Sequence, residues 1–398
     1  MQFEFNVIFA FILAGGWISG ILFKKITLPP ILGMVVCGIA FSLFLKPHTP
    51  SIVWELAPYL KSFALIVILL RAGLGLRRAA LKKVGRIALL MAFVPCIVEG
   101  TALTFMFHFF FDFNYAVAGL TGFMLAAVSP AVIVPSMLDL KKRAKGKNNE
   151  VPTIILAGAS ADDVFAITIF SVFLSLAQPQ ESAAAMSIFS AVLSVPFSII
   201  VGILSGLILG FVLSYIFNRH YTSIRATEKT LIILVASMLL VQVGDSLHFA
   251  ALLGLMTVGF ILLERQEKVA HELSEKLAKI WVFAEIILFV IIGFSLDIPT
   301  ALGAGLKGLA IIAVGLLFRS LGVYIATAGS NLTFKERVFC MIAYIPKATV
   351  QAALGGVALS HGIAEGNTIL AIAVVSILFT APLGLIGIRY FSNVLLSD

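Results

Sequence analysis

Apolar stretches long enough to cross a lipid bilayer recur along the whole chain. The hydrocarbon core is about 30 Å thick, so a spanning α-helix needs about 20 mostly apolar residues. Hydrophobic residues make up 60% of the sequence and charged residues only 12%, which leaves little for a soluble domain. The sequence therefore predicts an all-α polytopic membrane protein with thirteen transmembrane helices, near residues 6–23, 29–45, 57–76, 84–110, 115–138, 152–176, 186–216, 228–243, 248–263, 280–296, 301–328, 335–359 and 367–391.

The basic residues indicate how the chain is oriented. Most of the 28 Lys and Arg residues adjoin connections on one side, at 24–25, 77–86, 141–147, 219–229, 265–279, 335–337 and 389. Only Lys46, Lys61 and Lys307 flank the other side. The positive-inside rule then places the N-terminus outside and the C-terminus in the cytoplasm. We expect an integral protein of a bacterial inner (plasma) membrane. The net charge of +8 follows from these basic residues at one membrane face and does not indicate a surface that binds nucleic acid.

Five ionisable residues fall deep inside the predicted spans. Each would cost at least about 2.5 kcal/mol at the centre of an isolated helix, so each is expected to face a partner, the bundle interior or water. Glu99 and Arg319 are opposite in sign, which favours a structural salt bridge over direct ion handling. The other three are Asp162, Asp163 and Lys347.

The two halves of the chain match weakly at an offset of 220 residues. "AGLGLR" (72–77) falls on "IGFSLD" (292–297), with Gly73 over Gly293, and the same offset puts Glu99 over Arg319. Setting the seventh stretch aside as a linker gives two six-helix repeats. A shift of seven helices reverses direction through the membrane, so the repeats are inverted, an arrangement typical of secondary transporters.

Prolines interrupt the fifth and twelfth stretches, within "AAVSPAVIVPS" (126–136) and "AYIPKATVQAALGG" (343–356). Proline removes a backbone donor and leaves free carbonyls at mid-membrane depth, which need compensation. Lys347 directly follows Pro346, so we expect it either to neutralise carbonyls at a half-helix end or to pair with a carboxylate of the sixth stretch.

Two adjacent aspartates lie in the sixth stretch, "GASADDVFAI" (158–167). Side chains of successive helical residues point about 100° apart, so Asp162 and Asp163 are expected to have different roles. One can bind Na⁺ from a water-filled cavity while the other bonds to Lys347 or to a helix end. A carboxylate that binds either H⁺ or Na⁺ and faces each side in turn is sufficient for antiport.

Other functions are compatible with parts of this pattern. The aspartates could serve packing alone, or the chain could be a sodium-coupled solute symporter or an ion channel. An intramembrane aspartyl protease needs its two acids on facing helices, which adjacent residues do not provide, so we expect no catalytic residues. Cys37, Cys96 and Cys340 have no zinc spacing, and we expect no transition-metal site or cofactor.

In four motifs the sequence resembles the monovalent cation:proton antiporters, in particular the NHA-type sodium/proton exchangers. These motifs are "GASADDVFAI", "AVSPAVIVPS", "IPKATVQAALGG" and "ALIVILLRAGLGL". The resemblance implies the sodium/proton antiporter fold, with broken helices that cross in the core. It also implies a homodimer in the membrane lipid, in which the core moves like an elevator. Transported Na⁺ (or Li⁺) and H⁺ would be the only ligands.

The resemblance also implies domains and residue roles. Residues 1–83 (helices 1–3) and 225–298 (helices 8–10) would form the dimerisation domain. Residues 84–180 (helices 4–6) and 299–398 (helices 11–13) would form the core ion-transport domain. Residues 181–224 would be the linker, helix 7. Asp163 would be the main ion-binding carboxylate, Asp162 its partner, and Ser129 a ligand beside the break at Pro130. Electrogenic relatives have a lysine where this chain has Arg319. Because arginine keeps its proton, we hypothesise electroneutral exchange.

The segment "ERQEKVAHELSEKLAK" (264–279) holds four acids and four bases around His271. We interpret it as a charged interfacial helix on the cytoplasmic side. It is either a solvated connector or a pH sensor.

Overall fold

The computed structural model describes residues 3–75, 78–177, 188–247, 249 and 251–397, and all regular elements among them are helices. Nine of these helices are long and apolar enough to span a membrane. In chain order the helices are α1 (Phe5–Lys25), α2 (Pro30–Phe44), the 3₁₀ turn η1 (Lys46–His48), α3 (Ser51–Gly75), α4 (Arg78–Phe111), α5 (Tyr115–Ala126), α6 (Pro130–Lys142), α7 (Val151–Ala177), α8 (Ile188–Arg219), α9 (Ala226–Leu247), α10 (Ala251–Arg265), α11 (Glu267–Ser295), α12 (Ile298–Ala326), α13 (Phe334–Ala343), α14 (Thr349–Leu354), α15 (Val357–Ser360) and α16 (Gly366–Leu395).

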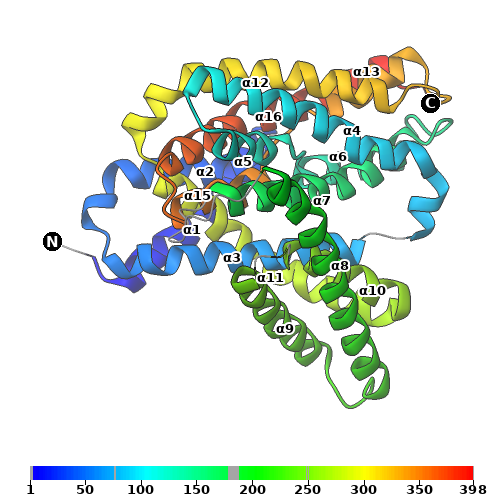
Figure 1. Ribbon diagram of the computed structural model, residues 1–398, viewed down its shortest axis with the longest axis horizontal. Coiled ribbons are helices and arrows are strands. Elements are labelled where there is room, and N and C mark those ends of the chain that lie inside the picture. Colours follow the sequence, from blue (N-terminus) through cyan, green and yellow to red (C-terminus); the bar gives the residue numbers. More distant parts are fainter. Residues whose placement is uncertain (1–2, 76–77, 178–187, 248, 250, 398) are drawn as a thin grey trace.

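The helices pack in two groups; in Figure 1, α4, α12 and α13 lie in the upper part and α3 and α8–α10 in the lower part. We call α4–α7 with α12–α16 the core group. In it α4 packs against α5, α7 and α12, and α16 packs against α12 and α13. The scaffold group is α1–α3 with α8–α11, in which α10 packs against α3 and α8, and α11 against α2 and α3. Fewer contacts join the groups, through α7 with α10, α2 with α16 and α3 with α14.

Glycines set two of the closest approaches in the scaffold group. A Cβ atom on Gly73 of α3 would lie 2.2 Å from the carbonyl oxygen of Met256 on α10. A Cβ atom on Gly293 of α11 would lie 2.3 Å from the carbonyl oxygen of Val35 on α2. Only glycine lets these backbones meet, because any other side chain would overlap a main-chain atom of the neighbouring helix.

Both helix interruptions expected from proline are present. Helix α5 ends at Ala126 and α6 begins at Pro130, while α13 ends at Ala343 and α14 begins at Thr349. The two breaks touch, since the Ser129 N–H donates to the Pro346 carbonyl over 2.8 Å. A further interruption, which the sequence did not predict, separates α14 from α15 at residues 355–356.

Several predicted boundaries were wrong. Helix α3 begins at Ser51 rather than near residue 57, so Lys61 lies inside the helix instead of at its outer flank. The charged segment 264–279 is not a separate helix, because α11 runs without a break from Glu267 to Ser295. Helix α4 begins at Arg78 but is kinked at Gly85, whose φ is 49°. The predicted start of the linker helix at 186 and the positions of Leu76 and Arg77 lie outside the described residues.

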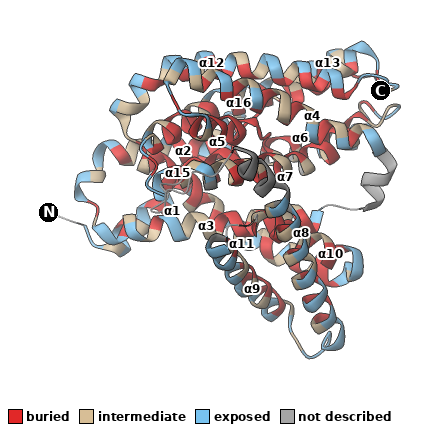
Figure 2. Cartoon of the chain, in the orientation of Figure 1, coloured by how far each residue is buried: buried red, intermediate tan, exposed pale blue. Residues whose placement is uncertain are grey.

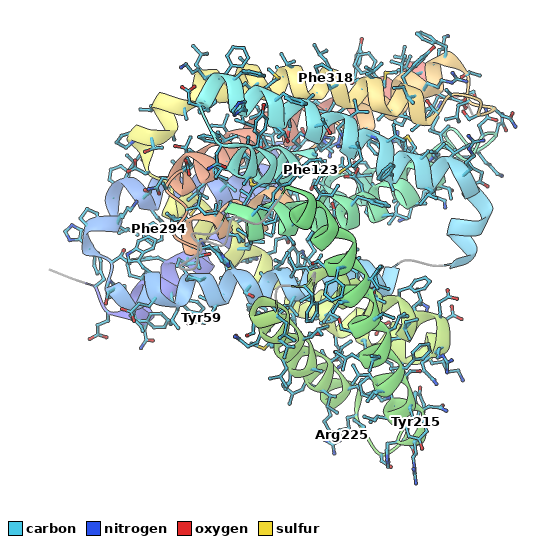
Figure 3. All side chains as sticks on the ribbon, in the orientation of Figure 1. Tyr59, Phe123, Tyr215, Arg225, Phe294 and Phe318 are labelled. Atoms are coloured by element: carbon cyan, nitrogen blue, oxygen red, sulfur yellow. The ribbon has the colours of Figure 1, made fainter. Side chains whose placement is uncertain are left out.

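Apolar side chains cover much of the outer surface, as membrane lipid requires. Figure 2 shows exposed residues along α8, α9 and the outer face of α12, whereas buried residues gather where the core-group helices meet. Phe318 on α12 and Tyr215 on α8 point outward in Figure 3 and are 39% and 64% exposed. Phe123 instead lies inside the core group, stacked on Phe173 with 5.8 Å between ring centroids.

The charged start of α11 is bonded to the first turn of α9 and to the loop before it. Lys229 Nζ lies 3.0 Å from Glu272 Oε2, and the Tyr221 hydroxyl donates to Glu272 Oε1 over 2.7 Å. This hydrogen bond to a carboxylate raises the pKa of Tyr221. His271 faces Glu267 at 3.9 Å, with both side chains more than half exposed, as expected of a solvated segment.

Candidate ion-binding site

The charged residues that the sequence singled out lie buried together at the helix breaks. Glu99 comes from α4, Asp162 and Asp163 from α7, Arg319 from α12, and Lys347 from the break between α13 and α14. None of these side chains is more than 5% exposed. Charges so far from water must compensate one another, so the pairing among them determines what each can do.

Arg319 holds two carboxylates at once. Its Nη1 lies 2.8 Å from Glu99 Oε2, the pairing expected from the opposite charges, and its Nη2 lies 3.0 Å from Asp162 Oδ1. Nη1 also donates to the carbonyl of Ala126, at the end of α5, and the guanidinium lies 5.2 Å from the centre of the Tyr344 ring. The planar fork of arginine suits such divided bonding, which a lysine ammonium could not reproduce in the same plane.

Lys347 compensates the same end of α5 as Arg319 does. Its Nζ lies 2.6 Å from Glu99 Oε1 and donates to the Leu125 carbonyl over 2.5 Å. The carbonyl contact is one of the two roles that the sequence suggested. Its carboxylate partner is Glu99 of α4, and neither aspartate of α7 pairs with it, contrary to the second suggestion.

Gln351 takes part in this compensation and was not predicted. Its Nε2 donates to the carbonyls of Met124 and Ala127, over 3.0 and 2.9 Å. These carbonyls at the end of α5 therefore accept hydrogen bonds from a side chain. A signal was available, because Gln351 is an amide side chain in the otherwise apolar run that follows the Pro346 break.

Ser129 lies at the first break, as expected. It is fully buried at the N-cap of α6, with Pro130 as the first helical residue. Its hydroxyl lies 3.5 Å from the hydroxyl of Thr349, the first residue of α14. The two breaks therefore face each other through a pair of hydroxyl groups.

The adjacent aspartates have different surroundings. Asp162 is held on both oxygens, by Arg319 at Oδ1 and by the Val128 N–H at Oδ2 over 2.8 Å. Asp163 Oδ1 is buried without a hydrogen-bond partner, and no ion pair to Asp163 occurs among the described residues. Asp162 is thus a fixed member of the network, whereas Asp163 has an oxygen that can still accept a hydrogen bond or bind a cation.

The formal charges of this cluster do not cancel. Three carboxylates face two cations, which leaves one negative charge when all five groups are ionised. One monovalent cation or one proton would neutralise the cluster. In the part of the chain that the structure describes, no group of three or more His, Cys, Asp or Glu side chains could hold a transition metal.

Three comparisons with known proteins bear on this arrangement. The sodium/hydrogen exchanger family profile, which describes a transmembrane region, matches residues 8–391. Sodium/hydrogen exchanger 9B2 of Mus musculus is 33% identical over 97% of this chain and 72% of its own length, and that of Homo sapiens is 34% identical over 97% and 74%. The fold is similar to that of the sodium proton antiporter MjNhaP1 from Methanocaldococcus jannaschii, with a TM-score of 0.80 at 21% identity over 96% of this chain and 98% of the other.

Interrupted helices that enclose a buried charge cluster inside a membrane-spanning bundle define a secondary transporter of ions. With a family match over almost its whole length, the chain belongs to the sodium/hydrogen exchanger family. Members of this family are transporters rather than enzymes, and they carry Na⁺ and H⁺ without a cofactor. The relatives named above come from mouse, human and an archaeon, so they give no support to the expected bacterial plasma membrane.

Proposed function

We propose that the protein exchanges Na⁺ (or Li⁺) for H⁺ and that the two ions compete for Asp163. The observation that carries this proposal is the contrast between neighbouring carboxylates, one held on both oxygens and one with a buried oxygen left unpartnered. Asp162, held by Arg319, also accepts a hydrogen bond from the Val128 N–H and so ties α7 to the first helix break beside its neighbour. Ser129 lies at the break and is a candidate oxygen ligand for the bound cation.

Charge balance favours an electroneutral cycle. Asp163 neutralises the cluster by binding either one Na⁺ or one H⁺, so both loaded states carry the same charge. Arg319 cannot alter this balance, because arginine does not lose its proton inside a protein. Lys347, the other cation of the cluster, can release a proton, but its contacts with Glu99 and the Leu125 carbonyl oppose that release.

Internal symmetry supports thirteen spans arranged as two inverted six-helix repeats and a linker. An offset of 220 residues carries α1, α2, α3 and α4 onto α9, α10, α11 and α12, and α5–α7 onto α13–α16. Residues related by this offset contact each other at the centre of the bundle: Glu99 contacts Arg319, and Ser129 contacts Thr349. Gly73 and Gly293 are related by the same offset, and each meets a backbone carbonyl of the other half.

The two packing groups support an elevator mechanism. The core group, with residues 84–180 and 299–398, would carry the ion site past a scaffold of residues 1–83 and 225–298. Residues 181–224 would link the halves, although α8 packs on α10 of the scaffold. Exposed apolar side chains along α1, such as Phe11 and Trp17, offer a surface for a homodimer within the lipid.

An odd number of spans fits the positions of the termini. The N-terminal and C-terminal ends lie at opposite ends of the long axis in Figure 1. Together with the basic clusters, this arrangement supports an N-terminus outside and a C-terminus in the cytoplasm.

Flux into proteoliposomes that contain an internal pH dye tests the proposed exchange. An inward Na⁺ gradient should drive H⁺ out of vesicles with the wild-type protein, and Asp163→Asn should abolish this movement. Asp139→Asn is the matched control, because Asp139 is a carboxylate on α6 that is 58% exposed and outside the buried cluster. Undiminished exchange by Asp163→Asn would refute the proposal, and Na⁺ uptake without H⁺ movement would favour a sodium-coupled symporter instead.

A further inference from the structure

A cavity of about 580 Å³ lies between the scaffold group and the core group, apart from the buried charge cluster. Its walls come from α3, α9 and α10 on one side and from α7, α14 and α15 on the other. Ser171, which lines it, lies eight residues beyond Asp163, about 12 Å further along α7. This volume is within the range of pockets that enclose small organic molecules.

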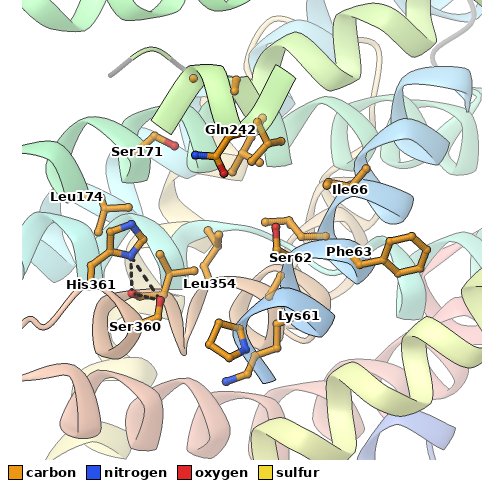
Figure 4. A pocket seen from close by; sticks show the side chains of 18 of the residues that line it. Lys61, Ser62, Phe63, Ile66, Ser171, Leu174, Gln242, Leu354, Ser360 and His361 are labelled. Carbon is orange, nitrogen blue, oxygen red and sulfur yellow. Dashed lines mark hydrogen bonds between the residues drawn. The ribbon is translucent and has the colours of Figure 1, made fainter. Parts of the chain in front are cut away.

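One lysine, Lys61, lines this cavity and lies at its lower edge in Figure 4. Lys61 lies ten residues into α3, about 15 Å from the start of the helix. Its Nζ lies close to Gly356, because a Cβ atom built on Gly356 would be 2.8 Å from this nitrogen. No hydrogen bond or ion pair to Lys61 occurs within the described residues, and the described lining includes no aspartate or glutamate. The Lys61 side chain is only partly exposed and lines an apolar cavity without a counter-ion, which favours an anion beside it.

Uncharged donors and apolar walls complete the cavity. Ser62, next to Lys61, and Gln242 of α9 both line it, and Figure 4 shows the Gln242 amide directed toward the space. The side chains of these two residues make no hydrogen bond to other described residues. Phe170, Leu174 and Leu354 contribute apolar surface. A single positive charge with neutral donors and apolar walls is complementary to a monoanion with a hydrophobic body.

We propose that this cavity is a binding site for an amphipathic organic monoanion, with Lys61 as its counter-ion and Ser62 and Gln242 as hydrogen-bond donors. The ligand would contact both groups of helices, through Lys61 on α3 and Leu354 on α14. Occupancy would therefore hold the groups together and inhibit transport, a consequence that rests on the proposed elevator motion. Binding itself does not depend on that motion.

A thermal-shift and calorimetric titration of the purified full-length protein with 2-naphthalenesulfonate tests the site. The sulfonate stays charged, and 2-naphthalenesulfonamide is a neutral probe of nearly the same shape. We expect the sulfonate to bind and raise Tm, and the sulfonamide to bind on the order of tenfold more weakly or worse. Lys61→Met should lose the preference for the sulfonate, whereas Lys61→Arg should keep it.

Two controls separate this inference from the proposed exchange. Lys307→Met removes an exposed lysine of α12 and should leave sulfonate binding unchanged. Asp163→Asn should still bind the sulfonate although it transports nothing, so a failure of the exchange proposal would leave this result standing. Equal binding of sulfonate and sulfonamide to the wild-type protein, or undiminished sulfonate binding by a folded Lys61→Met, would overturn the inference.

Discussion

Arg319 Nη2 lies 3.0 Å from Asp162 Oδ1, deep in the bundle, where neither side chain is more than 1% exposed. The same guanidinium holds Glu99, so one permanent cation fixes two carboxylates. The next residue of α7, Asp163, has no such anchor among the described residues. Under the proposed function, the adjacent aspartates divide a structural role and a transport role between them.

This division predicts opposite effects of two isosteric substitutions. Asp162→Asn removes a charge-assisted bond to Arg319 and should destabilise the protein by about 1.5–3 kcal/mol. Asp163→Asn removes an unpartnered buried carboxylate and should leave stability unchanged or higher. Thermal denaturation of both purified variants in one detergent at pH 7 provides the comparison. A larger loss of stability in Asp163→Asn than in Asp162→Asn would contradict the assignment.

Replacing Arg319 should lower the folding stability of the protein, whatever its effect on transport. Arg319→Gln leaves Glu99 with Lys347 alone and Asp162 without a cation, and breaking a buried ion pair costs about 3–5 kcal/mol. The double variant Glu99→Gln with Arg319→Gln removes one charge of each sign and should recover part of that loss. A double-mutant cycle on chemical unfolding measures the coupling. Additive losses would indicate that the pair is not energetically coupled.

Arg319→Lys should change the electrical character of exchange. It keeps the positive charge but introduces a group that can release a proton. The wild-type protein should give no net current on a solid-supported membrane under a Na⁺ gradient, while Arg319→Lys should give a transient current if it still transports. A current in the wild-type protein of the size expected for two protons per Na⁺ would exclude electroneutral exchange.

Gln351 should stabilise the first helix break. Replacing it with methionine keeps the volume but leaves the carbonyls of Met124 and Ala127 without their donor, at a cost of about 1–3 kcal/mol. We expect Gln351→Met to lower Tm and slow exchange. Gln266→Met, at the start of α11, should do neither, because its side chain makes no capping bond. Equal Tm values for the two variants would show that Gln351 does not support the break.

The scaffold glycines give a test of close packing. Gly73→Ala and Gly293→Ala place a methyl group 2.2 and 2.3 Å from backbone oxygens, so each should destabilise by about 1–3 kcal/mol. Gly303→Ala on α12 is the control, since a Cβ atom there meets nothing within 4 Å. Unfolding in a denaturing detergent ranks the three, and a Gly303→Ala loss as large as the others would refute the packing argument.

The sequence predicted the parts of this molecule that depend on local physics. Spanning length, proline breaks and the cost of intramembrane charge identified the all-helical membrane class, both proline interruptions and the pairing of Glu99 with Arg319. Three-dimensional choices were harder to predict. Nothing local indicates that Arg319 reaches Asp162 as well, or that Lys347 prefers Glu99, because both depend on how α4, α7 and α12 meet. Lys61 was misplaced because Glu55 and Pro58 interrupt the apolar pattern near the true start of α3.

Proton release on Na⁺ binding tests the central claim most directly. Purified protein in weakly buffered detergent at a pH where Asp163 is protonated is mixed with NaCl, and a pH dye counts protons, with choline chloride as the ionic-strength control. The account predicts about one proton released per chain by the wild-type protein and none by Asp163→Asn. Release of the same quantity by Asp163→Asn would contradict the claim that Na⁺ and H⁺ compete for this carboxylate.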